Sequence, residues 1–208
     1  MNTSMRSSAS PGSLPDADRM VEIIYQASRM FYERGFDGTS MSDIAAAMDL
    51  TKAGLYHYVV SKEDLLFKIM NFALDWLERE VIEPARDISD PSERLRWVIR
   101  RHGRQMLEGA SAVAIVAEEI LALSPNHRKL IVARRKVYFS LVHDAITAMQ
   151  AQGKLRAVDP TVAAYGLFGV LLWLPRWYDP AGALSSSEIL DNVTSLFFHG
   201  LLRTSSGA

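Results

Sequence analysis

The sequence predicts an all-α protein of about nine helices, with a small N-terminal head of three helices and a larger C-terminal helical body. Two observations predict this fold. Apolar residues recur at spacings of three and four along most of the 208-residue chain, which is the period of an amphipathic helix. Hydroxyl and carboxyl residues stand where helices would begin, and no stretch of useful length alternates as a β-strand does.

The predicted organisation has three parts. Residues 1–15 are rich in Ser, Gly and Pro and have no apolar run typical of a signal peptide, so we expect a disordered arm. Residues 16–62 form the expected head, and residues 63–204 the expected ligand-binding and dimerisation body. The longest apolar run, residues 162–174, is shorter than the ~18 residues of a membrane span. We therefore expect a soluble, cytoplasmic protein without a membrane partner.

The first helix of the head is expected to begin at Asp16 or Asp18 and to end near Arg34. Its apolar residues fall on one face, namely Met20, Ile23, Ile24, Ala27 and Phe31. Gly35 fits the left-handed conformation that commonly ends a helix.

Two very short helical segments follow, and each begins with a hydroxyl residue. Ser40 precedes the first, with Asp43 at the spacing of a capping box, and Thr51 precedes the second. A longer helix then begins at Ser61. Two short helices joined by a tight turn, the second rich in small, basic and aromatic residues, indicate a helix-turn-helix.

The start of the second short helix suits a DNA major groove, which is roughly 12 Å wide and accepts small or hydrogen-bonding side chains. Gly54 inside this helix costs about 1 kcal/mol relative to alanine, so close approach to DNA would explain it better than stability does. Tyr56 and Tyr58 also fit a core role with one wet edge. The net charge of −1 and the excess of acidic residues over residues 17–64 argue mildly against DNA binding.

Three ordered motifs carry a family resemblance: T-S-M-S-D-I-A at 39–45, K-A-G-L-Y-H-Y at 52–58 and S-K-E-D-L at 61–65. They resemble the TetR/AcrR family of transcriptional regulators. The resemblance implies that a double-stranded DNA operator is contacted by Ser40, Ser42, Thr51, Lys52, Ala53, Gly54, Tyr56, His57, Tyr58 and Lys62. Two heads of a dimer would reach successive major grooves about 34 Å apart, so the expected operator is palindromic.

The body is predicted to contain six helices, over about residues 61–84, 91–109, 112–123, 126–152, 160–177 and 185–201. Asp159-Pro160 and Ser185, with Glu188 at the spacing of a capping box, are expected to open helices, and Ser124-Pro125 and Gly153 to close them. In this prediction Pro84 ends the first of them and Asn126 caps the fourth. The helix after Asp159-Pro160 is apolar nearly all round, with Gly166 and Gly169 allowing close approach of another helix. The last two helices are therefore expected to form a homodimer, as the resemblance also implies; the alternative is ordinary monomer core.

The pattern W-x-x-x-W-Y-x-P-x-G-x-L-S-x-x-E-I at 173–189 resembles a subset of these regulators that controls fatty-acid, sterol or other acyl-CoA breakdown. This resemblance implies an apolar small-molecule effector, with an acyl-CoA thioester as the leading candidate. The candidate ligand-binding residues are Met106, Arg135, Phe139, Phe168, Trp173, Arg176 and Trp177. Taken one at a time, these aromatic residues and arginines fit ordinary core and solvated surface equally well.

The chain does not resemble an enzyme. Glu118 and Glu119 are adjacent on a predicted helix and point about 100° apart, which excludes a paired acid and base. There is no cysteine, the five histidines lack metal-ligand spacing, and no glycine-rich phosphate loop occurs. We expect neither metal nor cofactor. The expected function is a ligand-released repressor of lipid-metabolism genes; the alternatives are a multidrug-sensing repressor of an efflux pump and a helical ligand-binding or interaction protein that does not bind DNA.

Overall fold

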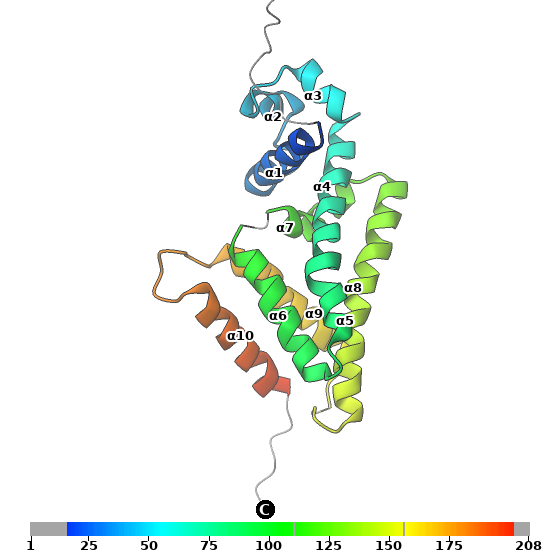
Figure 1. The fold of residues 1–208 in the computed structure, drawn as a ribbon, viewed down its shortest axis with the longest axis vertical. Helices are drawn as coiled ribbons and strands as arrows, with labels where there is room; N and C mark the ends of the chain where they lie inside the picture. Colours follow the sequence, from blue (N-terminus) through cyan, green and yellow to red (C-terminus); the bar gives the residue numbers. More distant parts are fainter. Residues whose placement is uncertain (1–15, 110, 156, 202–208) are drawn as a thin grey trace, which may run out of the picture.

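The computed structural model describes residues 16–109, 111–155 and 157–201, and within these residues the protein is all-α without a β-strand. The predicted arm at 1–15 and the last residues of the predicted body, 202–204, lie outside the described residues. The head helices α1 (Asp16–Arg34), α2 (Met41–Ala47) and α3 (Lys52–Tyr58) lie at one end of an elongated molecule (Figure 1). The long helix α4 (Lys62–Leu77) leads from the head into the body.

The body contains the remaining helices. They are the π-helical turn η1 (Glu78–Ile82), α5 (Glu83–Asp87), α6 (Pro91–Leu107), α7 (Ser111–Glu118), the 3-10 turn η2 (Ile120–Ala122), α8 (Pro125–Ala151), α9 (Pro160–Trp173), the 3-10 turn η3 (Leu174–Arg176) and α10 (Ser186–Leu201). Because α4, η1 and α5 follow one another without a break, the described residues form nine separate helical rods. The predicted all-α fold of about nine helices is confirmed.

Most predicted helix boundaries follow from local capping. Gly35 has a φ of 76°, the left-handed conformation that ends α1. The Ser40 amide donates to Asp43 (2.9 Å) while Ser40 Oγ accepts from the Asp43 amide (3.1 Å), which completes the capping box of α2. Thr51 Oγ1 accepts from the Gly54 amide at 3.0 Å and opens α3. Asp159 and Ser185 open α9 and α10 in the predicted way.

Two predicted boundaries are wrong. Pro84 does not end its helix, because the preceding turn is π-helical and the Glu83 amide bonds to the Glu78 carbonyl, so that Pro84 lies in the first turn of α5, where its missing amide costs little. Asn126 does not cap α8. Ser124 does, with its Oγ accepting from the His127 amide, and Pro125 takes the first helical position.

Two other helices are shorter than predicted, because each changes to 3-10 geometry near its end. The helix expected over 112–123 stops at Glu118 before η2, and the helix expected to end near Trp177 stops at Trp173 before η3. Trp173, the last residue of α9, and Trp177, directly after η3, are both more than half exposed.

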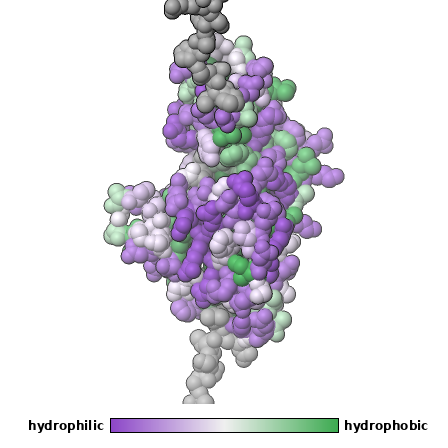
Figure 2. Space-filling view, in the orientation of Figure 1, coloured by the Kyte–Doolittle hydropathy of each residue, from purple (hydrophilic) through white to green (hydrophobic). Residues whose placement is uncertain are grey.

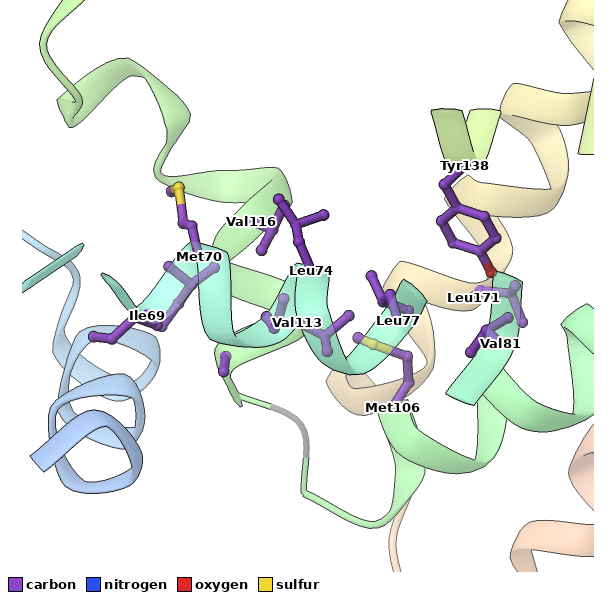
Figure 3. Close-up of a cluster of buried hydrophobic side chains, with 14 of the residues drawn as sticks. Ile69, Met70, Leu74, Leu77, Val81, Met106, Val113, Val116, Tyr138 and Leu171 are labelled. Atoms are coloured by element: carbon purple, nitrogen blue, oxygen red, sulfur yellow. The ribbon is translucent and has the colours of Figure 1, made fainter. Parts of the chain in front are cut away.

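The core runs through head and body. Ile44 and Leu55 are fully buried where α2 and α3 meet, and α1 packs on both α4 and α7. Within the body, α4 lies along α7 and α8, while α6 lies against α8, α9 and α10 (Figure 1). Figure 3 shows apolar side chains of α4, including Leu74 and Leu77, among those of its neighbours. The face in Figure 2 is mostly hydrophilic, with small hydrophobic patches in its upper part. No helix in the described residues has the length and apolar character to cross a membrane.

Candidate functional site

The head presents a short helix whose outer face is free of carboxylates. Leu55 is the buried residue of α3 and fixes it to the core, which leaves Thr51, Lys52 and Ala53 exposed at its start. Tyr56 is 43% exposed, and His57 is exposed beside it. No Asp or Glu occurs between Asp49 and Glu63. The acidic balance of the head as a whole therefore does not extend to this surface.

The remaining predicted DNA residues lie around α3, and some have a second role within the protein. Ser40 and Ser42 are exposed at the start of α2. Tyr58 is half-buried, with its ring edge-on to that of His57 at 5.4 Å. Lys62 is also half-buried, and its Nζ lies 4.2 Å from the centroid of the Phe36 ring, a cation–π contact that holds the ammonium near the surface of the head.

The cap of α3 does not by itself explain Gly54. A Cβ at this position would lie 3.2 Å from Thr51 Oγ1, which is tighter than ordinary van der Waals contact. Asp43 and Asp64, however, stand at the same position relative to the capping residues Ser40 and Ser61, so such a cap accepts a side chain there. Close approach to DNA therefore stays the prediction for this glycine.

Polar contacts gather where the head meets the body. Two of them cross between these parts: the Phe36 amide donates to Glu119 at 3.1 Å, and the Arg176 guanidinium lies 6.0 Å from the ring of Tyr32 on α1. Within the body, Arg176 also donates to Glu118 at 2.6 Å. The Glu63 carboxylate, in the first turn of α4 and directly after the head, accepts from the Ser124 amide at 2.8 Å and lies 2.9 Å from His127 Nδ1 at the start of α8.

The Glu63 contact has an electrostatic signature. Burial raises the pKa of its carboxyl, but the hydrogen bonds from the Ser124 amide and the His127 imidazole outweigh burial, so the pKa lies below its ordinary value. The His127 ring also stacks on Phe67, with centroids 3.8 Å apart. Glu63 is therefore held as a carboxylate that ties α4 to α8.

The body contains a cavity of about 690 Å³ between α4, α6, α7, α8 and α9. Its wall is mainly apolar and aromatic, with Leu74, Leu77, Val113, Val116, Phe139, Phe168 and Leu172 among the lining residues. Half-buried Arg135 and exposed Lys136 also line it and supply positive charge. The rings of Tyr138 and Phe168, at 5.1 Å, and of Phe139 and Tyr165, at 4.8 Å, form an aromatic row between α8 and α9.

A buried polar pair also lines this cavity. His102 on α6 is 2% exposed, and its Nδ1 lies 3.0 Å from the hydroxyl of Tyr138 on α8. Burial lowers the pKa of His102 to about 4 and raises that of Tyr138 above its ordinary range, so both side chains are neutral at pH 7. Within the described residues, His102 Nε2 has no hydrogen-bond partner.

The structure brings together some of the predicted ligand residues and separates the others. Arg135, Phe139 and Phe168 share the wall of the 690 Å³ cavity. Met106 lines a different cleft, of about 820 Å³, between α1 and the body, whose α1 side is polar. Trp173, Arg176 and Trp177 do not line the 690 Å³ cavity: Trp173 lies on the outer face of α9, and Arg176 and Trp177 follow after that helix has ended.

Sequence reasoning missed His102 and Tyr138 as cavity residues. His102 stands on the apolar face of α6 with Leu95, Val98 and Met106, and a histidine on such a face is a visible signal of a buried polar group. Which partner it would meet depends on the packing of α6 against α8, and the helical periodicity of neither segment contains that information.

The outer face of α9 carries an apolar stripe on the described surface. Val162, Tyr165, Val170 and Trp173 are 65%, 64%, 47% and 59% exposed, and Gly166 lies among them with open space around it. On α10, Leu196 is 74% exposed. Large apolar side chains in such numbers on the exposed faces of two helices are unusual for the free surface of a monomer.

An α2–α3 pair with an exposed, carboxylate-free second helix, set on a helical body, defines a helix-turn-helix regulator. The family models agree. Residues 23–69 match the model described as bacterial regulatory proteins, tetR family, and residues 89–201 match the model of the tetracyclin repressor-like C-terminal domain. The second match alone spans more than half of the chain. The protein belongs to the TetR family of transcriptional regulators and is a DNA-binding regulator.

Three relatives show which regulators of this family the chain is similar to. The crystal structure of AibR in complex with isovaleryl coenzyme A and operator DNA is 39% identical, with a TM-score of 0.81, and the match covers 86% of this chain and 98% of that one. PfmR from Thermus thermophilus, a TetR family regulator, is 32% identical with a TM-score of 0.75 over 87% of this chain and 99% of its own. The transcriptional repressor KstR2 of Mycobacterium tuberculosis is 25% identical over 89% of this chain and 94% of its own length. The homologues are transcriptional regulators rather than enzymes.

Proposed function

We propose that this protein is a homodimeric repressor of lipid-catabolism genes whose residues 16–62 bind a palindromic operator and whose body binds an acyl-CoA thioester that releases the DNA. One observation carries the effector assignment. The 690 Å³ cavity combines an apolar, aromatic wall with two cationic residues, Arg135 and Lys136. The similarity to AibR, which was crystallised with isovaleryl coenzyme A and operator DNA, supports the same chemistry.

An acyl-CoA thioester suits this cavity in two respects. Its acyl group needs an apolar enclosure, which the side chains of α4, α7 and α9 provide. Its phosphates need cations near the opening, and half-buried Arg135 with exposed Lys136 meets that requirement. A free fatty acid or an uncharged drug would use only the apolar part.

Operator contact is assigned to the exposed residues of α2 and α3. Thr51, Lys52, Ala53 and Gly54 lie at the start of the helix that would enter the major groove, and Tyr56 and His57 follow on its exposed side. Ser40, Ser42, Tyr58 and Lys62 would contact the backbone. Phosphate contacts position a regulator on DNA, while base contacts select its sequence. Lys52 is the charged residue that we expect to make one of these two contacts.

Dimerisation is assigned to the exposed apolar faces of α9 and α10. Covering Val162, Tyr165, Val170 and Leu196 with a second copy would remove large apolar side chains from water. Gly166 has no atom within 4 Å of the position of a Cβ, so a partner helix could approach closely there. Replacing Val170 or Leu196 by Asp should yield monomers in sedimentation analysis, whereas Leu121→Asp, on η2 at 77% exposure, should leave the dimer intact.

Communication between the sites is assigned to α4. Leu74 and Leu77, near its end, line the cavity, while Glu63, in its first turn, follows directly after the head. An effector that binds the DNA-incompetent arrangement more tightly shifts the population toward it, and moving from 1:99 to 99:1 takes about 5.5 kcal/mol of differential affinity.

The test is fluorescence anisotropy with labelled DNA flanking the protein's own gene. We expect specific binding at moderate salt, with release by acyl-CoA thioesters and not by coenzyme A alone or by free drugs. Release by drugs and not by thioesters would replace the proposed effector with that of a multidrug sensor. The absence of any specific complex would contradict the operator assignment.

A further inference from the structure

The His102–Tyr138 pair is the only polar feature contributed to the cavity by buried side chains in the described residues. Every other fully buried lining residue there is apolar, and Arg135 and Lys136 are partly or fully open to solvent. Figure 3 shows Tyr138 reaching from α8 toward Leu77, Leu171 and Val81. A buried polar group among apolar neighbours costs free energy unless it is hydrogen-bonded.

The number of satisfied hydrogen-bonding groups assigns the tautomer of His102. If Nδ1 carried the proton and donated to Tyr138, the hydroxyl proton would lack an acceptor and Nε2 would be an unpaired acceptor, because neither group has another partner in the described residues. If the Tyr138 hydroxyl donates to Nδ1, one unpaired group remains, the Nε2–H donor. The second arrangement leaves fewer buried groups unsatisfied.

The unpaired donor is neutral. Burial holds the pKa of His102 at about 4, and no carboxylate lines the cavity within the part of the chain that the structure describes. The neutral donor therefore matches an uncharged acceptor oxygen better than a carboxylate. A buried carboxylate would need a cation beside it to offset the free-energy cost of its desolvation. His102 lines the cavity, but its Nε2 atom has almost no accessible surface, so a ligand reaches this donor only by displacing the side chains over it. Arg135 lies about one turn of α8 before Tyr138, on the same wall of the cavity.

We propose that His102, oriented by Tyr138, is the specificity-determining donor of this cavity and that its effector carries an uncharged hydrogen-bond-accepting oxygen, a carbonyl, within its apolar part. This inference rests on the proposed acyl-CoA effector and narrows it. The oxygen has two sources in such a molecule: the thioester carbonyl itself, or a keto group farther along the acyl chain. Tyr138 acts as a positioning residue, because it fixes the tautomer.

Three probes separate these sources. Octanoyl-CoA has the thioester carbonyl, S-octyl-CoA is the thioether without it, and 7-oxooctanoyl-CoA has a second carbonyl near the end of the chain. Their dissociation constants are measured by calorimetry on the full-length protein and on three variants. His102→Leu removes the donor, His102→Gln keeps an amide donor near the position of Nε2, and Tyr138→Phe removes only the hydroxyl.

We expect wild-type protein to bind at least one carbonyl-bearing probe about tenfold more tightly than S-octyl-CoA, as one buried hydrogen bond allows. His102→Leu should abolish this preference and leave S-octyl-CoA affinity unchanged or higher, while His102→Gln should retain most of it. A preference for octanoyl-CoA assigns the oxygen to the thioester, and a preference confined to 7-oxooctanoyl-CoA assigns it to the chain.

Equal binding of all three probes by wild-type protein, or a preference that survives His102→Leu, overturns the inference while leaving the acyl-CoA proposal standing. Failure of all three probes to bind a protein that still binds its operator overturns both. If His102→Leu does not fold, Tyr138→Phe answers the same question, because it should reduce the carbonyl preference without opening a cavity larger than one hydroxyl.

Discussion

The head and the body place their functional residues in different ways. The candidate DNA surface comes from one short stretch, Ser40 to Lys62, in which caps, turn and exposed side chains follow one another along the chain. The cavity takes its wall from five helices between Leu74 and Leu172. A surface built from neighbouring residues can be recognised in a sequence and is stabilised locally. A cavity, in contrast, forms only when helices distant in the sequence pack together.

The largest expected effect is loss of the head alone. Leu55→Ala removes a fully buried side chain that holds α3 to the core, and such truncations cost about 2–5 kcal/mol. Operator binding should fall below detection, while octanoyl-CoA binding persists. Val60→Ala, at a side chain 86% exposed, is the control and should change stability by less than about 0.5 kcal/mol. Loss of both binding activities in Leu55→Ala would show that head and body fold as one unit.

Acid should weaken the body through His102. Because its pKa falls from 6.5 in the unfolded chain to about 4 when buried, the unfolded state binds more protons between these values, and stability falls as pH decreases through this window. The shift corresponds to about 3 kcal/mol at 1.36 kcal/mol per unit.

This loss is measured as the free energy of unfolding in denaturant at several pH values. His102→Gln, whose amide does not titrate, should flatten the dependence between pH 6.5 and 4 relative to wild type. Parallel curves for the two proteins would mean that His102 is protonated without cost, and the cavity would then be wetter than its lining indicates.

Lys52→Ala tests the head surface without disturbing its core. Lys52 is exposed in the first turn of α3, so its removal should weaken operator binding by about 1–3 kcal/mol and leave the melting temperature unchanged. If the ammonium contacts a phosphate, the slope of log affinity against log salt should decrease by about one. Lys154→Ala, beyond the end of α8, is the matched control, and an equal loss of affinity there would indicate a nonspecific effect of charge.

The smallest expected effect lies at the junction of the two regions. Glu63→Gln keeps an acceptor for Ser124 but removes the charge held beside His127, with an expected loss of about 1 kcal/mol for a partly exposed pair. Because Glu63 joins α4 to α8, the variant should also reduce the factor by which an acyl-CoA weakens operator binding. Glu33→Gln, an exposed residue of α1, should leave that factor unchanged; the opposite ranking would remove Glu63 from the path.

The sequence predicted those features that neighbouring residues determine. Ser40, Thr51 and Ser185 cap the helices that they were expected to cap, because a side-chain oxygen reaches only the next turn. Ser124-Pro125 was instead interpreted as the end of the preceding helix. Asp159-Pro160 has the same pattern, a capping residue followed by proline, and opens a helix. The prediction that Pro84 ends its helix was wrong for a different reason: the π-helical turn before it depends on packing.

Features that depend on contacts between distant helices could not be predicted from the sequence. Phe139 and Phe168 were expected in the cavity because aromatic residues commonly line such sites, and they are there. Trp173 and Trp177 were expected for the same reason but lie outside it, because Trp173 is on the outer face of α9 and Trp177 follows the 3-10 turn η3. His102 and Tyr138 meet only when α6 packs on α8, 36 residues apart in the sequence.

The length of α4 makes it a lever arm. Its 16 residues at 1.5 Å each span about 24 Å, with the cavity near one end and the head at the other. A tilt of about 5° at the cavity end therefore carries the head about 2 Å. In the proposed dimer, two heads swinging in opposite directions would double that travel, and a duplex whose grooves recur at a fixed interval of about 34 Å could not follow it.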